Sequence, residues 1–306
     1  MIISIIFPTY NEEGNLALLY EKVKAVTAQI KGYDFELVFI DDNSSDNTPQ
    51  ILNSLRQKDN KVRIVRFARN CGSHAAISCG LNYCHGEAAI VMAADLQDPP
   101  QLIGQLLEEW KKGSKIVWGA RKERKGESFL TKTSANIYYR MMNWLTTVKV
   151  PPRGADVFLV DKIVIDAFRQ VVEKHSSVFM TIAWLGFKQG TIYYNKEARF
   201  SGKSKWSLSK KIKLTIDSLL SFSDIPIRYM SVLGFLFALL GFIYAIYIFW
   251  LYVNGSPIQG WSSLMVAILV IGGIQMITLG VLGEYLWRTY DESRRRPRYV
   301  IEYKSE

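Results

Sequence analysis

The chain has 306 residues, more than one average domain, and its 49% hydrophobic content is normal for a globular protein. Its net charge of +10 indicates an anionic partner, either a membrane surface or nucleic acid. The three cysteines have no CxxC spacing, which argues against a cysteine-bound metal and fits reduced thiols.

The N-terminal part of the chain alternates apolar segments with amphipathic ones. Strands are predicted at residues 2–7, 37–40, 63–67, 88–92 and 115–118. Helices are predicted at 16–30, 48–57, 74–83 and 101–111. This alternation with short connections predicts an α/β fold with a mostly parallel, doubly wound sheet. The first segment carries no basic residues, so we do not expect it to be a signal peptide.

Polar side chains follow three of these strands. They are Pro8, Tyr10, Asn11 and Glu12 after the first, Asp42 after the second, and Asp95, Gln97 and Asp98 after the fourth. The carboxyl ends of parallel strands meet at one edge of a sheet, where ligands bind. Divalent cations such as Mg²⁺ use one or two carboxylates together with substrate phosphates. The pattern predicts a metal or phosphate site, although taken singly Asn11 and Asp42 are more often turn residues.

Two further observations bear on this edge. Asp98 also fits the N-cap of the helix that follows, with Pro99 in its first turn, whereas Asp95 precedes that cap. Neither a Walker P-loop nor a GxGxxG motif opens the first helix, which argues against an ordinary ATPase or dinucleotide enzyme.

The C-terminal part contains a different kind of segment. Residues 207–222 have apolar side chains on one helical face and lysines on the other, which predicts a helix in the membrane interface or an ordinary packing helix. Residues 229–253 and 261–283 carry no charge, and each run exceeds the roughly 20 residues that span a bilayer.

The distribution of basic residues predicts the topology. The loop at 254–260 has no Lys or Arg, whereas both flanks are rich in them, so both termini and the N-terminal domain are expected in the cytoplasm. The protein would then be a multi-pass protein of the inner membrane, and nucleic acid is the weaker explanation of the charge. Gly272, Gly273, Gly280 and Gly283 suit helix packing within the chain or in a homo-oligomer. Glu284 and Arg288 are spaced for an ion pair.

Several motifs, in this order, resemble those of the polyprenyl-phosphate glycosyltransferases, which include enzymes similar to dolichol-phosphate mannose synthase and to bactoprenol glucosyltransferases. They are FPTYNEEGN, DDNSSDNT, DLQDPP, GADVFLV, RFSGKSKW and GGIQMITLGVLGEYLWRTY. The resemblance implies a GT-A (Rossmann-like) nucleotide-sugar domain at 1–206 and an interfacial amphipathic helix at 207–226. It also implies two transmembrane helices within 227–288, at about 229–253 and 261–286, and a basic cytoplasmic tail at 289–306.

The resemblance also implies roles for individual residues. Nucleotide-sugar binding falls to Pro8, Tyr10, Asn11, Glu12, Asp42 and Asp95, and Asp95 with Gln97 would bind Mg²⁺ or Mn²⁺. Family members often have Asp-x-Asp where this chain has Ala93-Ala94-Asp95, so the first carboxylate is missing. Either the metal site is weaker, or waters, Gln97 or Asp98 complete its coordination.

Asp156 matches the position of the family's catalytic base. A phosphate monoester is already largely dianionic at pH 7, so Asp156 could instead orient the acceptor or the sugar. The resemblance assigns contacts with the acceptor phosphate to Arg121, Lys132, Ser134, Arg199 and Lys205. Basic residues near a membrane also serve simple attraction to lipid.

The resemblance implies transfer of one sugar, glucose from UDP-glucose, to undecaprenyl phosphate with inversion. GDP-mannose, UDP-N-acetylglucosamine and UDP-modified arabinose are alternative donors. A processive polysaccharide synthase shares the catalytic fold, but the chain lacks the Gln-x-x-Arg-Trp motif. The missing carboxylate at Ala93 also leaves open a non-enzymatic, membrane-anchored sensor of nucleotide sugars.

Overall fold

The computed structural model describes residues 1–122, 155–171, 176–196, 225–254 and 260–305. The chain forms two compact units. Unit one comprises Met1–Leu219 and Pro297–Glu306, and unit two comprises Leu220–Arg296.

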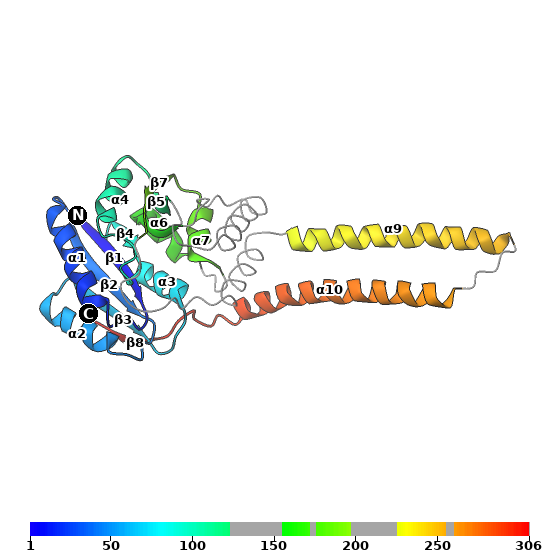
Figure 1. Cartoon of the computed structure of the whole chain (residues 1–306), viewed down its shortest axis with the longest axis horizontal. Coiled ribbons are helices and arrows are strands. Elements are labelled where there is room, and N and C mark those ends of the chain that lie inside the picture. The colour runs from blue at the N-terminus through cyan, green and yellow to red at the C-terminus, as the bar shows by residue number, and fades with distance from the viewer. Residues whose placement is uncertain (123–154, 172–175, 197–224, 255–259, 306) are drawn as a thin grey trace. The chain divides into compact units, whose positions relative to one another are not determined.

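Unit one is built on a single mixed sheet with the strand order β7-β5-β6-β4-β1-β2-β3-β8 (Figure 1). The strands are β1 (Ile2–Thr9), β2 (Asp34–Asp41), β3 (Val62–Phe67), β4 (Ala88–Val91), β5 (Ile116–Arg121), β6 (Ala155–Asp161), β7 (Gln189–Tyr194) and β8 (Ile301–Lys304). Strands β1 to β4 pair in parallel, as do β5 and β7, whereas β6 is antiparallel to β4 and β5, and β8 to β3. All five predicted strands are confirmed, and β6, β7 and β8 were not predicted.

The four predicted helices are also confirmed. They are α1 (Leu16–Gln29), α2 (Thr48–Lys58), α3 (Ser73–Tyr83) and α4 (Leu102–Lys111), and the structure adds α6 (Lys162–Arg169) and α7 (Val178–Trp184). Apolar side chains of α1, α2 and α4 join Ile3, Ile5 and Phe7 of β1 in the main core. Because strand side chains alternate, Ile6 lies on the other face, where it meets α3.

The predicted cap at Asp98 is wrong. Helix α4 begins at Leu102, and its N-cap residue is Gln101. The N–H groups of Leu102 and Ile103 donate to the carbonyls of Pro99 and Pro100, both at 3.0 Å. The Asp98 carboxylate therefore does not cap α4.

The C-terminal segment is part of the sheet rather than only a basic tail. Strand β8 pairs with β3, and Arg66 Nε donates to Glu302 Oε2 at 2.9 Å. The N–H of Ile64 donates to Ser305 Oγ at 2.8 Å. Residues beyond the second apolar helix thus complete one edge of unit one.

Arg298 holds this segment against α3, and His74 of α3 contacts the start of α7. Arg298 donates to Ser78 Oγ at 3.2 Å and to the carbonyl of Ser176 at 2.9 Å. His74 Nδ1 accepts from the N–H of Val178 at 3.2 Å. Burial lowers the pKa of His74 to about 4, and the charge of Arg298 adds to this shift, so His74 is neutral at pH 7.

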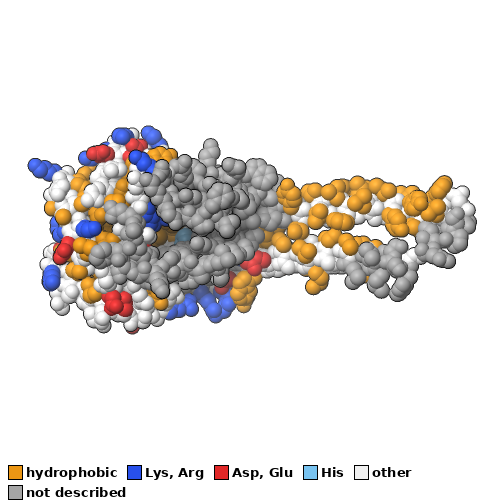
Figure 2. Space-filling model, viewed as in Figure 1, with side chains coloured by type: hydrophobic (Ala, Val, Ile, Leu, Met, Phe, Trp, Pro, Cys, Tyr) orange, Lys and Arg blue, Asp and Glu red, His pale blue; other side chains and the backbone are white. Residues whose placement is uncertain are grey.

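Unit two consists of α9 (Ile225–Val253) and α10 (Trp261–Ser293). Each contains a window long and apolar enough to cross a membrane, Val232–Leu251 and Val270–Ser293, and neither window is buried. Apolar side chains cover the visible surfaces of both helices (Figure 2). The Glu284–Arg288 ion pair is confirmed at 3.0 Å. A Cβ added to any of the four α10 glycines named above would meet no described atom within 4 Å, and their role in helix packing stays a prediction.

Replacement of Gly80 by alanine tests the packing of α3 on the sheet. The added Cβ would lie 2.2 Å from Ile6 Cγ2, and we expect Gly80→Ala to lower the free energy of unfolding by about 1–3 kcal/mol. Gly104→Ala in α4 is the matched control, because no atom lies within 4 Å of its added Cβ. Alanine favours a helix by up to about 1 kcal/mol over glycine, so the control should be neutral or stabilising. Thermal unfolding in detergent measures both; equal melting temperatures would contradict the packing.

His74 predicts a pH dependence of stability. Its pKa is about 4 in the folded protein against 6.5 in an ordinary histidine, so the unfolded chain binds more protons between these values. Stability should fall as the pH drops below 6.5, by about 2 kcal/mol between pH 7 and pH 5. Chemical denaturation at both pH values measures this loss. His74→Asn should remove it, and an unchanged slope in that variant would contradict the assignment.

Candidate active site

The topology brings the predicted polar clusters to one edge of the sheet. Strands β1, β2, β4, β5 and β7 end there, and the antiparallel β6 begins there. Asp156, the second residue of β6, therefore lies at the same edge as Asp42, Asp95 and Arg121, which end or follow β2, β4 and β5. The convergence at a carboxyl edge is confirmed.

Asn11 and Glu12 join the loops that follow β1 and β2. The N–H of Asn11 donates to Ser44 Oγ at 2.9 Å, and its Oδ1 accepts from the N–H of Ser45 at 2.8 Å. The N–H of Glu12 donates to Thr48 Oγ1 at 2.9 Å. Asn11 has a φ of 52°, a left-handed conformation that asparagine tolerates well. These contacts fix the shape of the edge beside Tyr10.

Asp42 holds the loop that opens α3. Its Oδ1 accepts from the N–H of Cys71 at 2.6 Å, and its Oδ2 accepts from the N–H of Gly72 at 2.8 Å. Gly72 has a φ of 88°, a conformation that glycine adopts at no steric cost. A carboxylate oxygen can accept more than one hydrogen bond, so these two contacts do not prevent Asp42 from also binding a nucleotide base. That role of Asp42 stays a prediction.

Arg66 connects this edge to the C-terminal strand. Its Nη1 donates to Asp41 Oδ2 at 2.6 Å, while its Nε bonds Glu302 of β8 at 2.9 Å. Burial disfavours its charge, but the two carboxylates outweigh burial and raise the pKa of Arg66. This link could not be predicted from local sequence patterns, because Glu302 lies 236 residues from Arg66 in the sequence.

The segment after β4 contains the candidate metal ligands. Asp95 is buried, and its Oδ1 accepts from the N–H of Gln97 at 3.2 Å. Leu96, between them, has a φ of 62°, which is strained for a side chain of this kind. Asp98 Oδ2 is buried and has no hydrogen-bond partner among the described residues. Burial raises the pKa of Asp98, against the attraction of Lys196.

These residues fit a particular mode of metal binding. No group of three or more His, Cys, Asp or Glu side chains in the described parts of the chain could enclose a metal. Mg²⁺ commonly uses one or two carboxylates together with substrate phosphates. This mode requires oxygen ligands. The segment after β4 offers them in Asp95, Gln97 and the oxygen of Asp98 that has no hydrogen-bond partner among the described residues.

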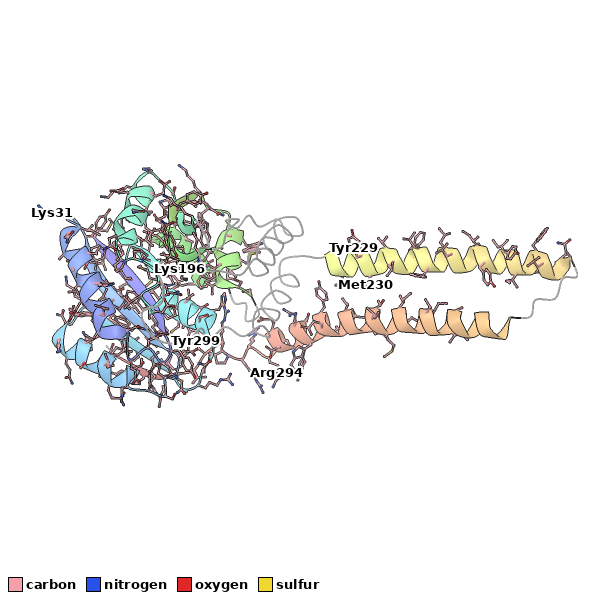
Figure 3. The ribbon with its side chains drawn as sticks, viewed as in Figure 1. Lys31, Lys196, Tyr229, Met230, Arg294 and Tyr299 are labelled. Atoms are coloured by element: carbon pink, nitrogen blue, oxygen red, sulfur yellow. The ribbon has the colours of Figure 1, made fainter. Side chains whose placement is uncertain are left out.

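Two cations hold the carboxylate of Asp156. Arg121 donates to its Oδ2 through Nε, at 2.9 Å, and through Nη2. Lys196 Nζ donates to the same oxygen at 2.6 Å (Lys196 is labelled in Figure 3). Burial opposes ionisation, but the charges of Lys196 and Arg121 outweigh it and lower the pKa of Asp156. An acid of lowered pKa is a weak proton acceptor, so this environment favours orientation over base catalysis.

Lys196 and Tyr194 link Asp156 to the segment after β4. Tyr194 donates to Asp98 Oδ1 at 2.6 Å, and Lys196 Nζ lies 4.0 Å from the same oxygen. Neither residue was predicted to belong to the site, because strand β7 was not predicted from the sequence. The aromatic and β-branched run of β7, followed by a lysine, was the available signal.

The remaining predicted contacts lie outside the described residues. These are Lys132, Ser134, Arg199 and Lys205, together with the predicted amphipathic helix at 207–222. Of the predicted acceptor residues, Arg121 is described, and it lies at the site through its contact with Asp156.

Comparison with known proteins identifies the family. Glycosyl transferase family 2 matches residues 4–176, and the GtrB C-terminal hairpin matches residues 225–288. The chain belongs to glycosyl transferase family 2. It is a glycosyltransferase with a GT-A type fold, as the motifs predicted.

Several relatives match nearly the whole chain. An uncharacterized glycosyltransferase, YkcC, of Bacillus subtilis is 39% identical over 98% of this chain and 93% of its own length. The bactoprenol glucosyl transferase of Shigella phage SfV and the prophage bactoprenol glucosyl transferase homolog of Escherichia coli are each 34% identical, over 98% of both chains. Glucosyl-3-phosphoglycerate synthase from Mycobacterium tuberculosis is a more distant structural neighbour, with a TM-score of 0.48 and 15% identity over 70% of this chain and 75% of its own.

Proposed function

We propose that the protein transfers one glucose residue from UDP-glucose to undecaprenyl phosphate, with inversion, at the cytoplasmic face of the inner membrane. The observation that carries this proposal is the match to bactoprenol glucosyl transferases over 98% of both chains, which includes the apolar hairpin. The positions of polar residues at the carboxyl edge of the sheet also support it.

The donor half of the site lies after β1, β2 and β4. Pro8, Tyr10, Asn11, Glu12 and Asp42 border the nucleotide, and Asp95 and Gln97 bind Mg²⁺ or Mn²⁺. When bound by these residues, the metal would supply Lewis-acid stabilisation of the departing nucleoside diphosphate. Asp95 is buried in the segment after β4, and its bond from the N–H of Gln97 restricts its carboxylate, which supports this role.

The acceptor half lies after β5 and β7. Arg121 and Lys196 provide positive charge for the acceptor phosphate, aided by Lys132, Ser134, Arg199 and Lys205. An oxygen of this phosphate attacks the anomeric carbon while the bond to the nucleoside diphosphate breaks on the opposite side, which inverts the configuration. The phosphate is largely dianionic at pH 7 and needs little deprotonation. Asp156 therefore positions Arg121 and Lys196, in keeping with its lowered pKa.

Chain connectivity supports the proposed topology. Met1–Leu219 and Pro297–Glu306 belong to the same unit, so both flanks of the α9–α10 hairpin lie on one side of any membrane that it crosses. The basic flanks support a cytoplasmic position for that side. Residues 207–226 would lie in the interface, and the small residues of α10 would support a homo-oligomer.

Transfer from a panel of radiolabelled donors tests the function. We expect one UDP-sugar, UDP-glucose, to give a lipid-monophosphate sugar with undecaprenyl phosphate, and only when Mg²⁺ or Mn²⁺ is present. GDP-mannose, UDP-N-acetylglucosamine and UDP-modified arabinose complete the panel. A product from another donor would correct the sugar. Donor binding without any lipid product would instead support the membrane-anchored sensor that Ala93 leaves open.

Substitutions at Asp156 and Lys196 test the positioning role. Asp156→Asn should lower kcat by about 100-fold or more and leave nucleotide binding intact. Lys196→Gln removes one of the two cations that contact Asp156, so the pKa of Asp156 should rise and the acidic limb of the kcat/KM profile should move to higher pH. Lys22→Gln, on the exposed face of α1, is the control. Wild-type turnover in Asp156→Asn would overturn the assignment.

A further inference from the structure

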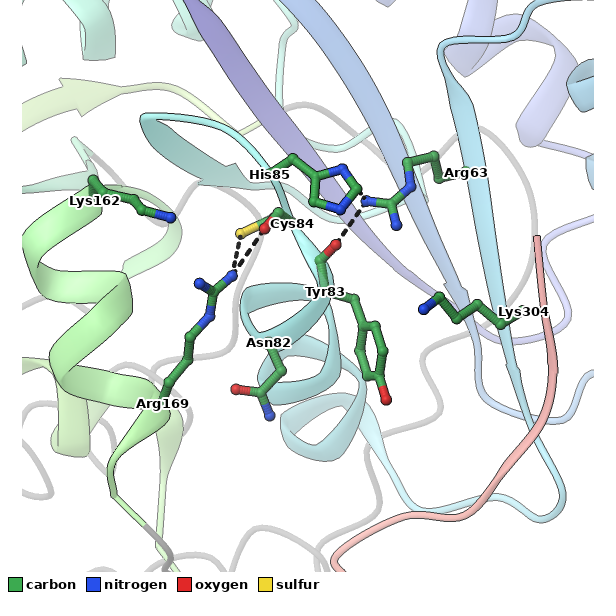
Figure 4. Close-up of a pocket in the computed structure, with 8 residues that line it drawn as sticks. All are labelled: Arg63, Asn82, Tyr83, Cys84, His85, Lys162, Arg169 and Lys304. Carbon is green, nitrogen blue, oxygen red and sulfur yellow. Dashed lines mark hydrogen bonds between the residues drawn. The ribbon is translucent and has the colours of Figure 1, made fainter. Parts of the chain in front are cut away.

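A pocket of about 380 Å³ opens at the opposite edge of the sheet from the candidate active site. It lies where β3 starts, where the antiparallel β8 ends and where α6 follows β6. Its walls come from Arg63 of β3, residues 82–85 at the C-terminal end of α3, Lys162 and Arg169 of α6, and Lys304 of β8 (Figure 4). No residue that we place in the glycosyltransferase reaction contributes to it.

The pocket has an excess of positive charge. Four of its lining residues are Lys or Arg, and among the described residues only Glu36 and Asp166 form ion pairs with them. Lys304 pairs with no described carboxylate, and its Nζ lies 4.8 Å from the centre of the Tyr83 ring. Burial raises the pKa of the Cys84 thiol to about 11, so this side chain is neutral and offsets none of the charge.

The two arginines are held in place by backbone carbonyls. Arg63 Nη1 donates to the carbonyl of Tyr83 at 2.7 Å (Figure 4). Arg169 donates through Nε to Leu81 at 3.2 Å and through Nη2 to Cys84 at 2.8 Å. Guanidinium groups fixed in this way lose little freedom when they bind an anion.

We propose that this pocket binds a phosphate monoester. Planar guanidinium groups and lysines are the side chains that proteins use for phosphate, and the excess charge suits a dianion. The volume lies within the range of about 300–1,000 Å³ that is typical of small-molecule sites, so a sugar phosphate would fit. The bound phosphate would join β8, through Lys304, to α6, through Lys162 and Arg169. The proposal is independent of the proposed function, because it concerns the other edge of the sheet.

Equilibrium dialysis of the full-length protein in detergent with ³²P-labelled inorganic phosphate tests the site. Saturating UDP and Mg²⁺ are included to occupy the active site. We expect saturable binding that the double variant Lys162→Gln/Lys304→Gln weakens by about tenfold or more. Lys112→Gln, an exposed lysine of α4's C-terminal end, is the matched control and should bind as the wild type does.

Two competition experiments distinguish a soluble phosphate ligand from a lipid headgroup. Glucose 1-phosphate should displace the label if the ligand is soluble, and phosphatidic acid in phosphatidylcholine nanodiscs should displace it if the ligand is a lipid headgroup. Displacement by either supports a phosphate site. Equal binding of the label by wild type and the double variant, with UDP and Mg²⁺ present, would overturn the proposal.

Discussion

Strand β6 runs antiparallel between β4 and β5, and the chemistry of the site depends on this reversal. Because of it, β6 begins where its neighbours end, and Asp156 lies at the edge that also carries Asp95 and Asp98. Several carboxylates at one buried edge repel one another unless cations compensate them. Arg121 and Lys196 supply that compensation, so the strand order and the charge balance are parts of the same arrangement.

The charge balance differs on the two sides of the site. Neighbouring cations stabilise Asp156 as an anion, whereas burial raises the pKa of Asp98. One carboxylate oxygen of Asp98 also has no hydrogen-bond partner among the described residues. Alanine at position 93, where the resemblance leads one to expect aspartate, leaves one negative charge fewer in the segment after β4. Under the proposed function, this lessens repulsion of the diphosphate and places more of the metal binding on Asp95, Gln97 and Asp98.

Much of the fold and part of the site could be predicted from sequence, for a physical reason. Periodic apolar patterns are local, and they predicted β1 to β5 and α1 to α4 together with the polar residues after each strand. Contacts between distant segments were not predictable in this way. The bond between Tyr194 and Asp98 joins residues 96 apart, and it replaced the helix cap that the local pattern predicted. Lys196 was missed likewise, because its role depends on the pairing of β7 with β5.

The position of β8 has a consequence for how the protein is made. The ribosome synthesises this strand after both apolar helices, yet it pairs with β3, a strand from the first quarter of the chain. Until the hairpin has left the ribosome, the free edge of β3 exposes unpaired N–H and C=O groups that invite wrong pairing. Completion of the sheet is therefore a late folding event that follows synthesis of both apolar helices. A truncated soluble domain without residues 297–306 would keep this open edge and would tend to aggregate.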